Sequence, residues 1–225
     1  MQPAAYRQRV PRPAGSRTGP PPPWASLPSE RRSGITLERV TAGLPPPGTE
    51  VDAAGALAVT AAVLVPVFAA ESGEATVLLT RRSEQLGRDP GHVAFPGGGV
   101  EPGESPADAA VREAGEEIGL YAGEVEVAGL LDVVGRAADE RIAAFLGVLR
   151  HRPRLVLNRS EVESVHEVPL TELLADGAAW QERWPAEGRE RTIHFFGGTA
   201  VLGDDLVWGV SARILWHLLE RAVAA

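Results

Sequence analysis

The chain has 225 residues, of which 44% are apolar and 23% charged, as is typical of a globular protein with a sizeable core. All 22 of its basic residues are arginines, and it contains neither lysine nor cysteine. These absences exclude a Schiff-base or P-loop lysine, a cysteine nucleophile, a Cys-ligated zinc ion and any disulfide. Any metal must be held by carboxylates, histidines or backbone oxygens, which favours hard ions such as Mg²⁺ or Mn²⁺.

The charge is divided unevenly along the chain. Residues 1–33 carry six arginines against one acid and are rich in proline, whereas the whole chain has a formal charge of −8. We interpret residues 1–33 as a flexible, disordered arm whose removal leaves the body folded, and residues 34–225 as one domain. The acidic body argues against nucleic acid as a partner. No secretory signal follows the early arginines, so we expect a cytoplasmic protein.

Residues 53–70 are an uncharged stretch of 18 residues, the lower limit for a membrane-spanning helix. Eight of these residues are alanine, which is weakly apolar, and Pro66 interrupts the strongly apolar part. The density of β-branched residues favours a buried strand. We therefore expect no membrane partner, and a membrane-tethered scaffold is the least favoured of the functional hypotheses.

The remaining elements follow in chain order. The patterns predict a short helix over 37–43, strands at about 60–69 and 75–80, and a loop rich in glycine over 81–99. A helix is predicted over about 106–118, because Ser105 can cap it and Gly119 can end it. Beyond it we predict strands at 124–134, 142–149 and 163–168, a helix at 169–174, a loop carrying Trp180 and Trp184, a strand at 192–196 and a helix at 209–223. Without regular βαβ alternation, this order indicates a single mixed α+β domain.

The helix predicted over 106–118 presents three carboxylates on one face. Glu113 and Glu117 lie about 40° apart and roughly 6 Å along the axis, and Glu116 lies about 60° away on the other side of Glu113. Like charges at this spacing repel one another, so we expect Arg112 or a divalent cation to compensate them. By itself such a charge run is usually a solvated helix face.

The full pattern around this helix resembles the Nudix box, G-x5-E-x7-R-E-U-x-E-E-x-G-U, in which U is apolar. Every position is filled, by Gly98, Glu104, Arg112, Glu113, Ala114, Glu116, Glu117, Gly119 and Leu120. The resemblance implies a Nudix fold, with a mixed β-sheet sandwiched between helices. It also implies a hydrolase that cleaves a nucleoside diphosphate linked to another group and that uses Mg²⁺ or Mn²⁺.

The resemblance further implies a metal site on the acidic helix. Glu113 and Glu117 are the leading ligands, Glu116 is a ligand or a water-mediated partner, and the Gly98 region offers a backbone carbonyl. Such an open cluster suits Mg²⁺, which prefers one or two carboxylates together with waters and substrate phosphates.

Other residues are expected to support the reaction. Arg112 would orient the acids by pairing with Glu104 or Glu116. The general base stays open between a box glutamate and a downstream acid, either Glu161 or Glu163. The residues expected to be catalytic are thus Arg112, Glu113, Glu116, Glu117 and Glu161.

The segment before the box resembles the coenzyme A pyrophosphatase signature, L-L-T-x-R-[SA]-x3-R-x3-G-x3-F-P-G-G. All fixed positions match except the second arginine, which falls at Gly87 with Arg88 adjacent. The resemblance implies that coenzyme A or a derivative is cleaved to 3′,5′-ADP and 4′-phosphopantetheine. Guanidinium groups bind phosphates bidentately, which suits this substrate. The expected substrate-binding residues are Arg82, Arg88, Phe95, Gly97 and Gly98.

Alternatives remain for the substrate and for catalysis. A Nudix hydrolase of ADP-ribose, a dinucleoside polyphosphate or a nucleoside triphosphate would carry the same box. A non-catalytic, nucleotide-sensing Nudix-like module would be expected to lose box glutamates, and none is lost here. Trp180, Trp184 and Trp208 can stack on an adenine, although packing is the commoner role. The expected partner is a small nucleotide, and the oligomeric state, a homodimer included, stays open.

Overall fold

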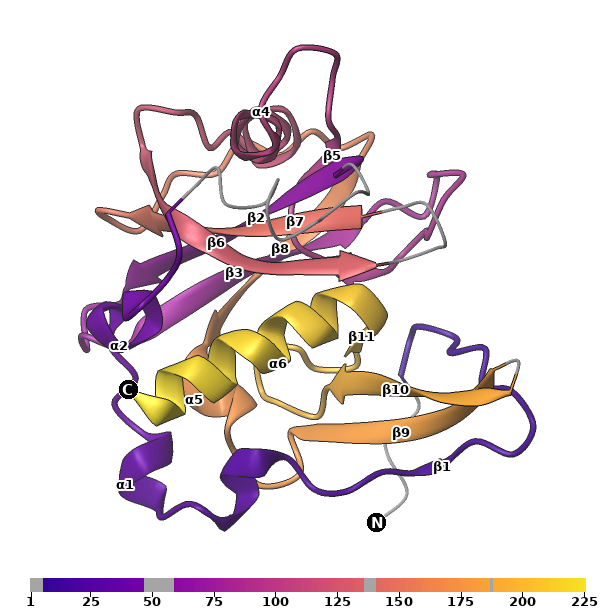
Figure 1. The fold of residues 1–225 in the computed structure, drawn as a ribbon. Helices are drawn as coiled ribbons and strands as arrows, with labels where there is room; N and C mark the ends of the chain where they lie inside the picture. Colours follow the sequence, from indigo (N-terminus) through magenta and orange to yellow (C-terminus); the bar gives the residue numbers. More distant parts are fainter. Residues whose placement is uncertain (1–5, 47–58, 136–140, 187) are drawn as a thin grey trace.

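The computed structural model describes residues 6–46, 59–135, 141–186 and 188–225 (Figure 1). Within these residues the larger sheet has seven strands, and its β2–β7 pair is parallel while its other pairs are antiparallel. Its main path runs β4 (Val93–Ala94), β3 (Ala75–Arg82), β2 (Ala61–Ala69), β7 (Arg141–Leu149) and β6 (Val125–Gly135), with β5 (Gly97–Gly99) paired to β2 and β8 (Val162–Pro169) paired to β3. The predicted mixed α+β fold is confirmed.

A smaller sheet lies below the first and was largely missed by the sequence patterns. Its order is β1 (Arg17–Thr18), β9 (Ala179–Ala186), β10 (Arg189–Phe196) and β11 (Val207–Trp208). The loop predicted around Trp180 and Trp184 is wrong, because both residues belong to strand β9. The Trp180 ring stacks on Phe195 of β10 with 5.3 Å between centroids. Such cross-strand aromatic pairs stabilise a strand whose charged residues obscure the usual alternation.

Helices separate and cover these sheets, as Figure 1 shows. Helix α4 (Pro106–Ile118) covers one face of the larger sheet, and α6 (Gly209–Ala224) lies between the two sheets. The predicted caps of α4 are confirmed, since Ser105 Oγ accepts a hydrogen bond from Asp108 N at 3.1 Å and Gly119 adopts φ +78°. The shorter helices are η1 (Pro23–Ser26), α1 (Ser29–Arg32), α2 (Leu37–Thr41) and α5 (Leu170–Leu173).

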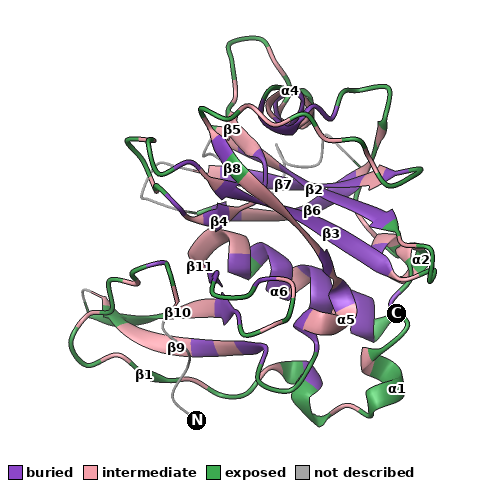
Figure 2. Ribbon diagram, turned by 180° about the vertical axis from the view of Figure 1, so that it is seen from behind, coloured by how far each residue is buried: buried purple, intermediate pink, exposed green. Residues whose placement is uncertain are grey.

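Two apolar cores result from this layering, and Figure 2 shows the buried residues along β2, β3 and α6. One core packs α4 residues such as Ala114 and Ile118 against Leu64 and Phe145 of the larger sheet. The other joins the opposite sheet face to α6 and the smaller sheet. Most of the apolar stretch 53–70 is strand β2, and residues 53–58 lie outside the described part. In the described ranges, no helix is long and apolar enough to cross a membrane.

The flexible arm expected over residues 1–33 does not hold for residues 6–33. Strand β1 pairs with β9, and Arg12 Nε lies 2.9 Å from both carboxylate oxygens of Glu182. Trp24 is 1% exposed and packs against Trp216 of α6, with 4.7 Å between ring centroids. Composition misled the prediction because one buried tryptophan and specific ion pairs can order a proline-rich segment that has little apolar surface. Residues 1–5 lie outside the described part.

His194 of β10 makes the fold sensitive to acid. Burial, and then the positive charges of His217, Arg213 and Arg183, lower the pKa of His194 from 6.5 to about 4. As the pH falls, the histidine of the unfolded chain binds its proton before that of the folded chain. The contribution of neutral His194 to the free energy of unfolding is therefore fully present above about pH 6.5 and is lost towards pH 4. Because the side chain is only partly buried, we expect a loss on the order of 1 kcal/mol between pH 7 and pH 5. Urea unfolding of His194→Phe, which keeps a ring against Trp216, should show a smaller loss over that interval.

Candidate active site

Strand β5 brings a glycine loop against the acidic helix. A Cβ at Gly98 would lie 2.4 Å from Glu113 Oε1, so only glycine allows the loop and the carboxylate to approach this closely. Gly97 adopts φ +156°, and a Cβ there would lie 2.3 Å from the Ala62 carbonyl oxygen of β2. The two glycines therefore position the start of the box between the sheet and α4.

Arg112 organises the outer side of the acidic helix. Its guanidinium donates to Glu104 Oε1 at 2.9 Å, to Glu113 Oε1 at 3.0 Å and to Glu116 Oε2 at 3.3 Å. It also donates to the Gly99 carbonyl oxygen at 3.0 Å. Hydrogen bonding with Glu104 raises the pKa of Arg112 and lowers the pKa of Glu104. The expected pairing of Arg112 with Glu104 or Glu116 is confirmed for both acids.

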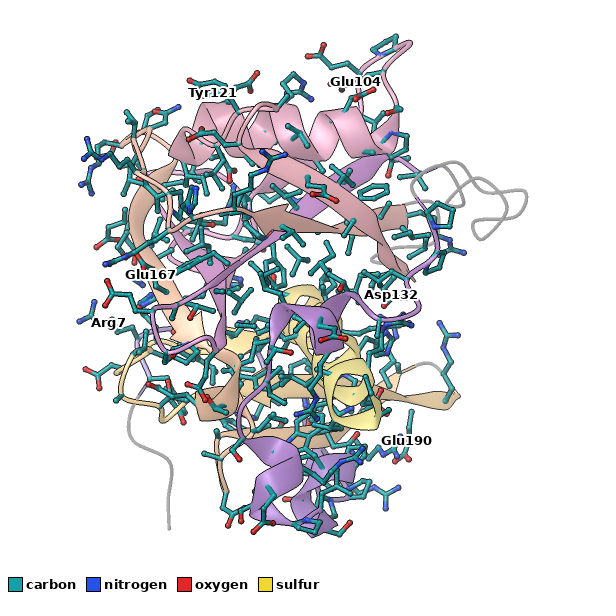
Figure 3. All side chains as sticks on the ribbon, turned by 90° about the vertical axis from the view of Figure 1, so that its left-hand side faces the viewer. Arg7, Glu104, Tyr121, Asp132, Glu167 and Glu190 are labelled. Atoms are coloured by element: carbon teal, nitrogen blue, oxygen red, sulfur yellow. The ribbon has the colours of Figure 1, made fainter. Side chains whose placement is uncertain are left out.

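These contacts connect Arg112, in the middle of α4, to Gly99 and Glu104 at the beginning of the box. Figure 3 shows Glu104 and Tyr121 at opposite ends of α4. Arg112 thus ties the loop before the helix to the helix face, and it neutralises part of the charge on Glu116, whose side chain is 57% exposed. Because one guanidinium serves three carboxylates, Glu113 is left only partly compensated.

Glu117 lies on the inner side of the helix and is 3% exposed. Burial raises the pKa of Glu117 to about 8, and the nearest cation is Arg82, whose Nη1 lies 3.8 Å from Glu117 Oε1. Glu117 Oε2 is buried without a hydrogen-bond partner among the residues that the structure describes. Burial also raises the pKa of Glu113. Both carboxylates are therefore short of positive charge.

This donor set fits a hard divalent cation. Nowhere in the described ranges do three acidic or histidine side chains already form a metal cage. Mg²⁺ needs no such cage, since it takes one or two carboxylates and completes its shell with water and phosphate oxygens. Glu113 and Glu117 can supply these two carboxylates, and the orphaned Oε2 of Glu117 is an available ligand atom.

The two downstream acids have different surroundings. Glu161 follows the loop after β7, where Asn158 Nδ2 donates to its Oε1 at 2.9 Å. The Asn158 backbone amide donates to the Glu117 carbonyl oxygen at 2.9 Å, so this loop lies against the acidic helix. The negative charge of Glu161 also helps to raise the pKa of Glu113 and of Glu117. Glu163 instead accepts a hydrogen bond from Arg81 Nε at 3.1 Å. The structure thus brings Glu161, and not Glu163, to the acidic helix.

A cavity of about 580 Å³ opens beside the glycine loop. All five residues expected to bind substrate line it, namely Arg82, Arg88, Phe95, Gly97 and Gly98. The Arg88 side chain is 63% exposed, and Arg82 Nη2 donates to the Arg88 carbonyl oxygen at 3.5 Å. Just after Arg88 the chain turns through left-handed backbone at Asp89, φ +50°, and Gly91, φ +67°.

The opposite wall of the cavity is formed by the start of α6. Trp208, Gly209, Val210 and Ser211 line this wall, and His92 contacts Trp208 with 5.3 Å between ring centroids. Of the three tryptophans considered for stacking, Trp208 therefore reaches the cavity, while Trp180 and Trp184 pack with Phe195. The residues of this wall carry no charge, and Trp208 is the one among them that the sequence analysis named, as a candidate for stacking on an adenine.

Comparisons with known proteins agree with this geometry. A family model described as "NUDIX domain" matches residues 58–187. "Nudix hydrolase 3" of Caenorhabditis elegans is 38% identical over 172 residues, which cover 70% of each chain. "Nudix hydrolase 22, chloroplastic" of Arabidopsis thaliana is 34% identical over 158 residues, 69% of this chain, and the match spans only 52% of its own length. A MutT/nudix family protein from Enterococcus faecalis shares the fold, with a TM-score of 0.51 at 20% identity over 76% of this chain and 64% of the other.

Proposed function

The chain belongs to the Nudix family, and from that premise we propose that it is a metal-dependent hydrolase of a small nucleoside-diphosphate-linked substrate. One observation carries this proposal: Arg82 lines the cavity and its Nη1 lies 3.8 Å from the buried, uncompensated carboxylate of Glu117, while Gly98, another lining residue, contacts Glu113. Hydrolysis of a diphosphate needs charge neutralised on phosphate oxygens, an activated water and fixed positions for both. The arrangement can supply all three.

The residues divide the work by position. Glu113 and Glu117 would hold Mg²⁺ or Mn²⁺, with Glu116 and the Gly98 backbone at the edge of the site. When bound, the ion neutralises phosphate oxygens and lowers the pKa of the attacking water. Arg112 holds the carboxylates of Glu104, Glu113 and Glu116 in place and ties them to the Gly99 carbonyl oxygen. Glu161 is our candidate for accepting the proton of that water, because it is an acid beside the metal ligands.

We propose coenzyme A or a derivative as the substrate, with 3′,5′-ADP and 4′-phosphopantetheine as products. Two arginines on the cavity wall, Arg82 and Arg88, support this choice, because coenzyme A carries a 3′-phosphate besides its diphosphate. Arg82 lies next to Glu117 and would meet the reacting diphosphate. Arg88 lies farther out, where it can reach the additional phosphate.

Arg88→Ala should separate these substrates. We expect KM to rise about tenfold or more for coenzyme A and much less for ADP-ribose, which lacks the 3′-phosphate, because a charge-assisted hydrogen bond is lost for one substrate only. Steady-state kinetics with Mg²⁺ and Mn²⁺, and products identified by mass spectrometry, measure the difference. Arg150→Ala, an exposed arginine at the end of β7, is the control. Equal losses on both substrates, or faster turnover of ADP-ribose by the parent, contradict the choice of coenzyme A and leave the hydrolase proposal standing.

A further inference from the structure

A buried polar cluster connects the N-terminal segment with both walls of the cavity. It consists of Gln8, Arg81, Gly91 and Asp205, and we name it the Asp205 cluster. Its three polar side chains are 8% (Gln8), 5% (Arg81) and 4% (Asp205) exposed. These residues come from four separate parts of the chain, so nothing local in the sequence requires them to meet. Polar groups this deeply buried are costly unless their hydrogen bonds are made.

Gln8 satisfies its side-chain amide through two residues of this cluster and the adjacent Leu206 amide. Its Nε2 donates to the Gly91 carbonyl oxygen at 3.0 Å and to Asp205 Oδ1 at 2.9 Å. Its Oε1 accepts from the Leu206 amide at 2.7 Å. The neighbouring Arg7 amide donates to the Asp204 carbonyl oxygen at 2.9 Å, so the segment is also held by its backbone. One amide group thus bridges the loop around Gly91 and the segment 204–206.

Arg81 reinforces the same two connections from strand β3. Its Nη1 donates to the Gly91 carbonyl oxygen and to Asp205 Oδ1, both at 3.1 Å. It also binds Glu84 and Glu163. The Gly91 carbonyl oxygen therefore accepts from two buried donors, one on the N-terminal segment and one on the sheet. Without Gln8, the guanidinium would hold Gly91 without a link to the N-terminal segment.

The Asp205 cluster adjoins both walls of the cavity, so it can influence how the cavity binds substrate. Gly91 immediately precedes His92 and ends the loop that carries Arg88 and Asp89. The lining of the cavity includes Arg88, Asp89 and His92. On the other side, Asp205 lies three residues before Trp208, where the opposite wall begins. The cluster therefore links the loop that carries one wall of the cavity to the segment that leads into the other.

We propose that Gln8 is a positioning residue: through its buried amide, the N-terminal segment holds the loop 84–92 against the wall at Trp208 and thereby sets the affinity for substrate. The effect on kinetics rests on the proposed function, whereas the effect on the loop does not. Because Gln8 touches neither the box glutamates nor Arg82, its loss should weaken substrate binding without removing catalytic groups. We therefore expect the loss of the Gln8 hydrogen bonds to raise KM with little change in kcat.

The test uses the full-length protein and the variant Gln8→Met, which keeps the side-chain volume and removes all three hydrogen bonds. Gln8→Glu is the second variant, since it replaces the donor by a carboxylate facing Asp205 and the Gly91 carbonyl oxygen. Arg9→Ala, an exposed neighbour, is the control. Hydrogen–deuterium exchange without substrate measures segments 84–92 and 205–211, and kinetics with coenzyme A and ADP-ribose measure KM and kcat.

We expect exchange in the two segments to be about tenfold faster in Gln8→Met, KM to rise about tenfold and kcat to stay within about twofold of the parent. Gln8→Glu should show larger changes, and Arg9→Ala none. Parent-like exchange in both Gln8 variants overturns the proposal, and so does a uniform acceleration over the whole chain. If exchange changes as expected but neither the parent nor any variant hydrolyses a diphosphate, the positioning role stands and the proposed function fails.

Discussion

Replacing Glu117 by glutamine is expected to lower kcat about 100-fold or more, and Glu113→Gln should have a similar effect. The physical reason is the charge imbalance on α4. Glu117 is buried with one carboxylate oxygen unpartnered among the described residues, and Glu113 shares a single guanidinium with two other acids. Glutamine has nearly the same shape and volume as glutamate, so each substitution removes the negative charge that would bind a cation and leaves the packing unchanged.

Folding should survive both substitutions, because they remove a charge that burial disfavours and that repels its neighbours. Urea unfolding should therefore show equal or slightly higher stability. Isothermal titration calorimetry with Mg²⁺ and electron paramagnetic resonance of Mn²⁺ should show weaker metal binding. Glu126→Gln, an exposed acid on β6, controls for the general loss of negative charge. Near-parent kcat in both variants at saturating metal would place the metal site elsewhere.

Replacing Trp24 by alanine is expected to cost about 3–5 kcal/mol of unfolding free energy, the range for removing a large buried aromatic side chain. Trp24 is 1% exposed between Trp216 of α6 and Phe196 of β10, so its loss opens a void where the helix meets the smaller sheet. A chain starting at residue 34 should be destabilised at least as much, since it also loses β1 and the hydrogen bonds of Gln8.

Urea unfolding followed by tryptophan fluorescence and circular dichroism measures both variants. Ser26→Ala is the matched control, because Ser26 is exposed in the same short helix η1. Parent-like stability of the shortened chain would restore the flexible-arm interpretation for residues 6–33. A destabilised chain that keeps its kcat would show that the segment supports the fold without contributing to the chemistry.

Local chemistry by itself determined the part of the protein built around α4. Ser105 and Gly119 define the ends of that helix, and the 3.6-residue period places Glu113 and Glu117 on one face whatever the helix packs against. The β-branched runs likewise predicted β2, β3, β6 and β7 within a few residues, because buried strands need such side chains. These features depend on residues close together in the chain, so a motif can encode them.

Tertiary structure alone decided the rest of the site. Glu161 and Glu163 are two residues apart and chemically alike. The loop before β8 is bonded to α4 and holds Glu161 near the acidic helix, whereas the pairing of β8 with β3 brings Glu163 to Arg81. Gln8 meets Asp205 across 197 residues, and β1 finds its partner β9 at a similar separation. Such contacts form only when distant segments pack together, because the burial and the hydrogen bonds that stabilise them exist only in the folded chain. No pattern within a short window of sequence carries that information.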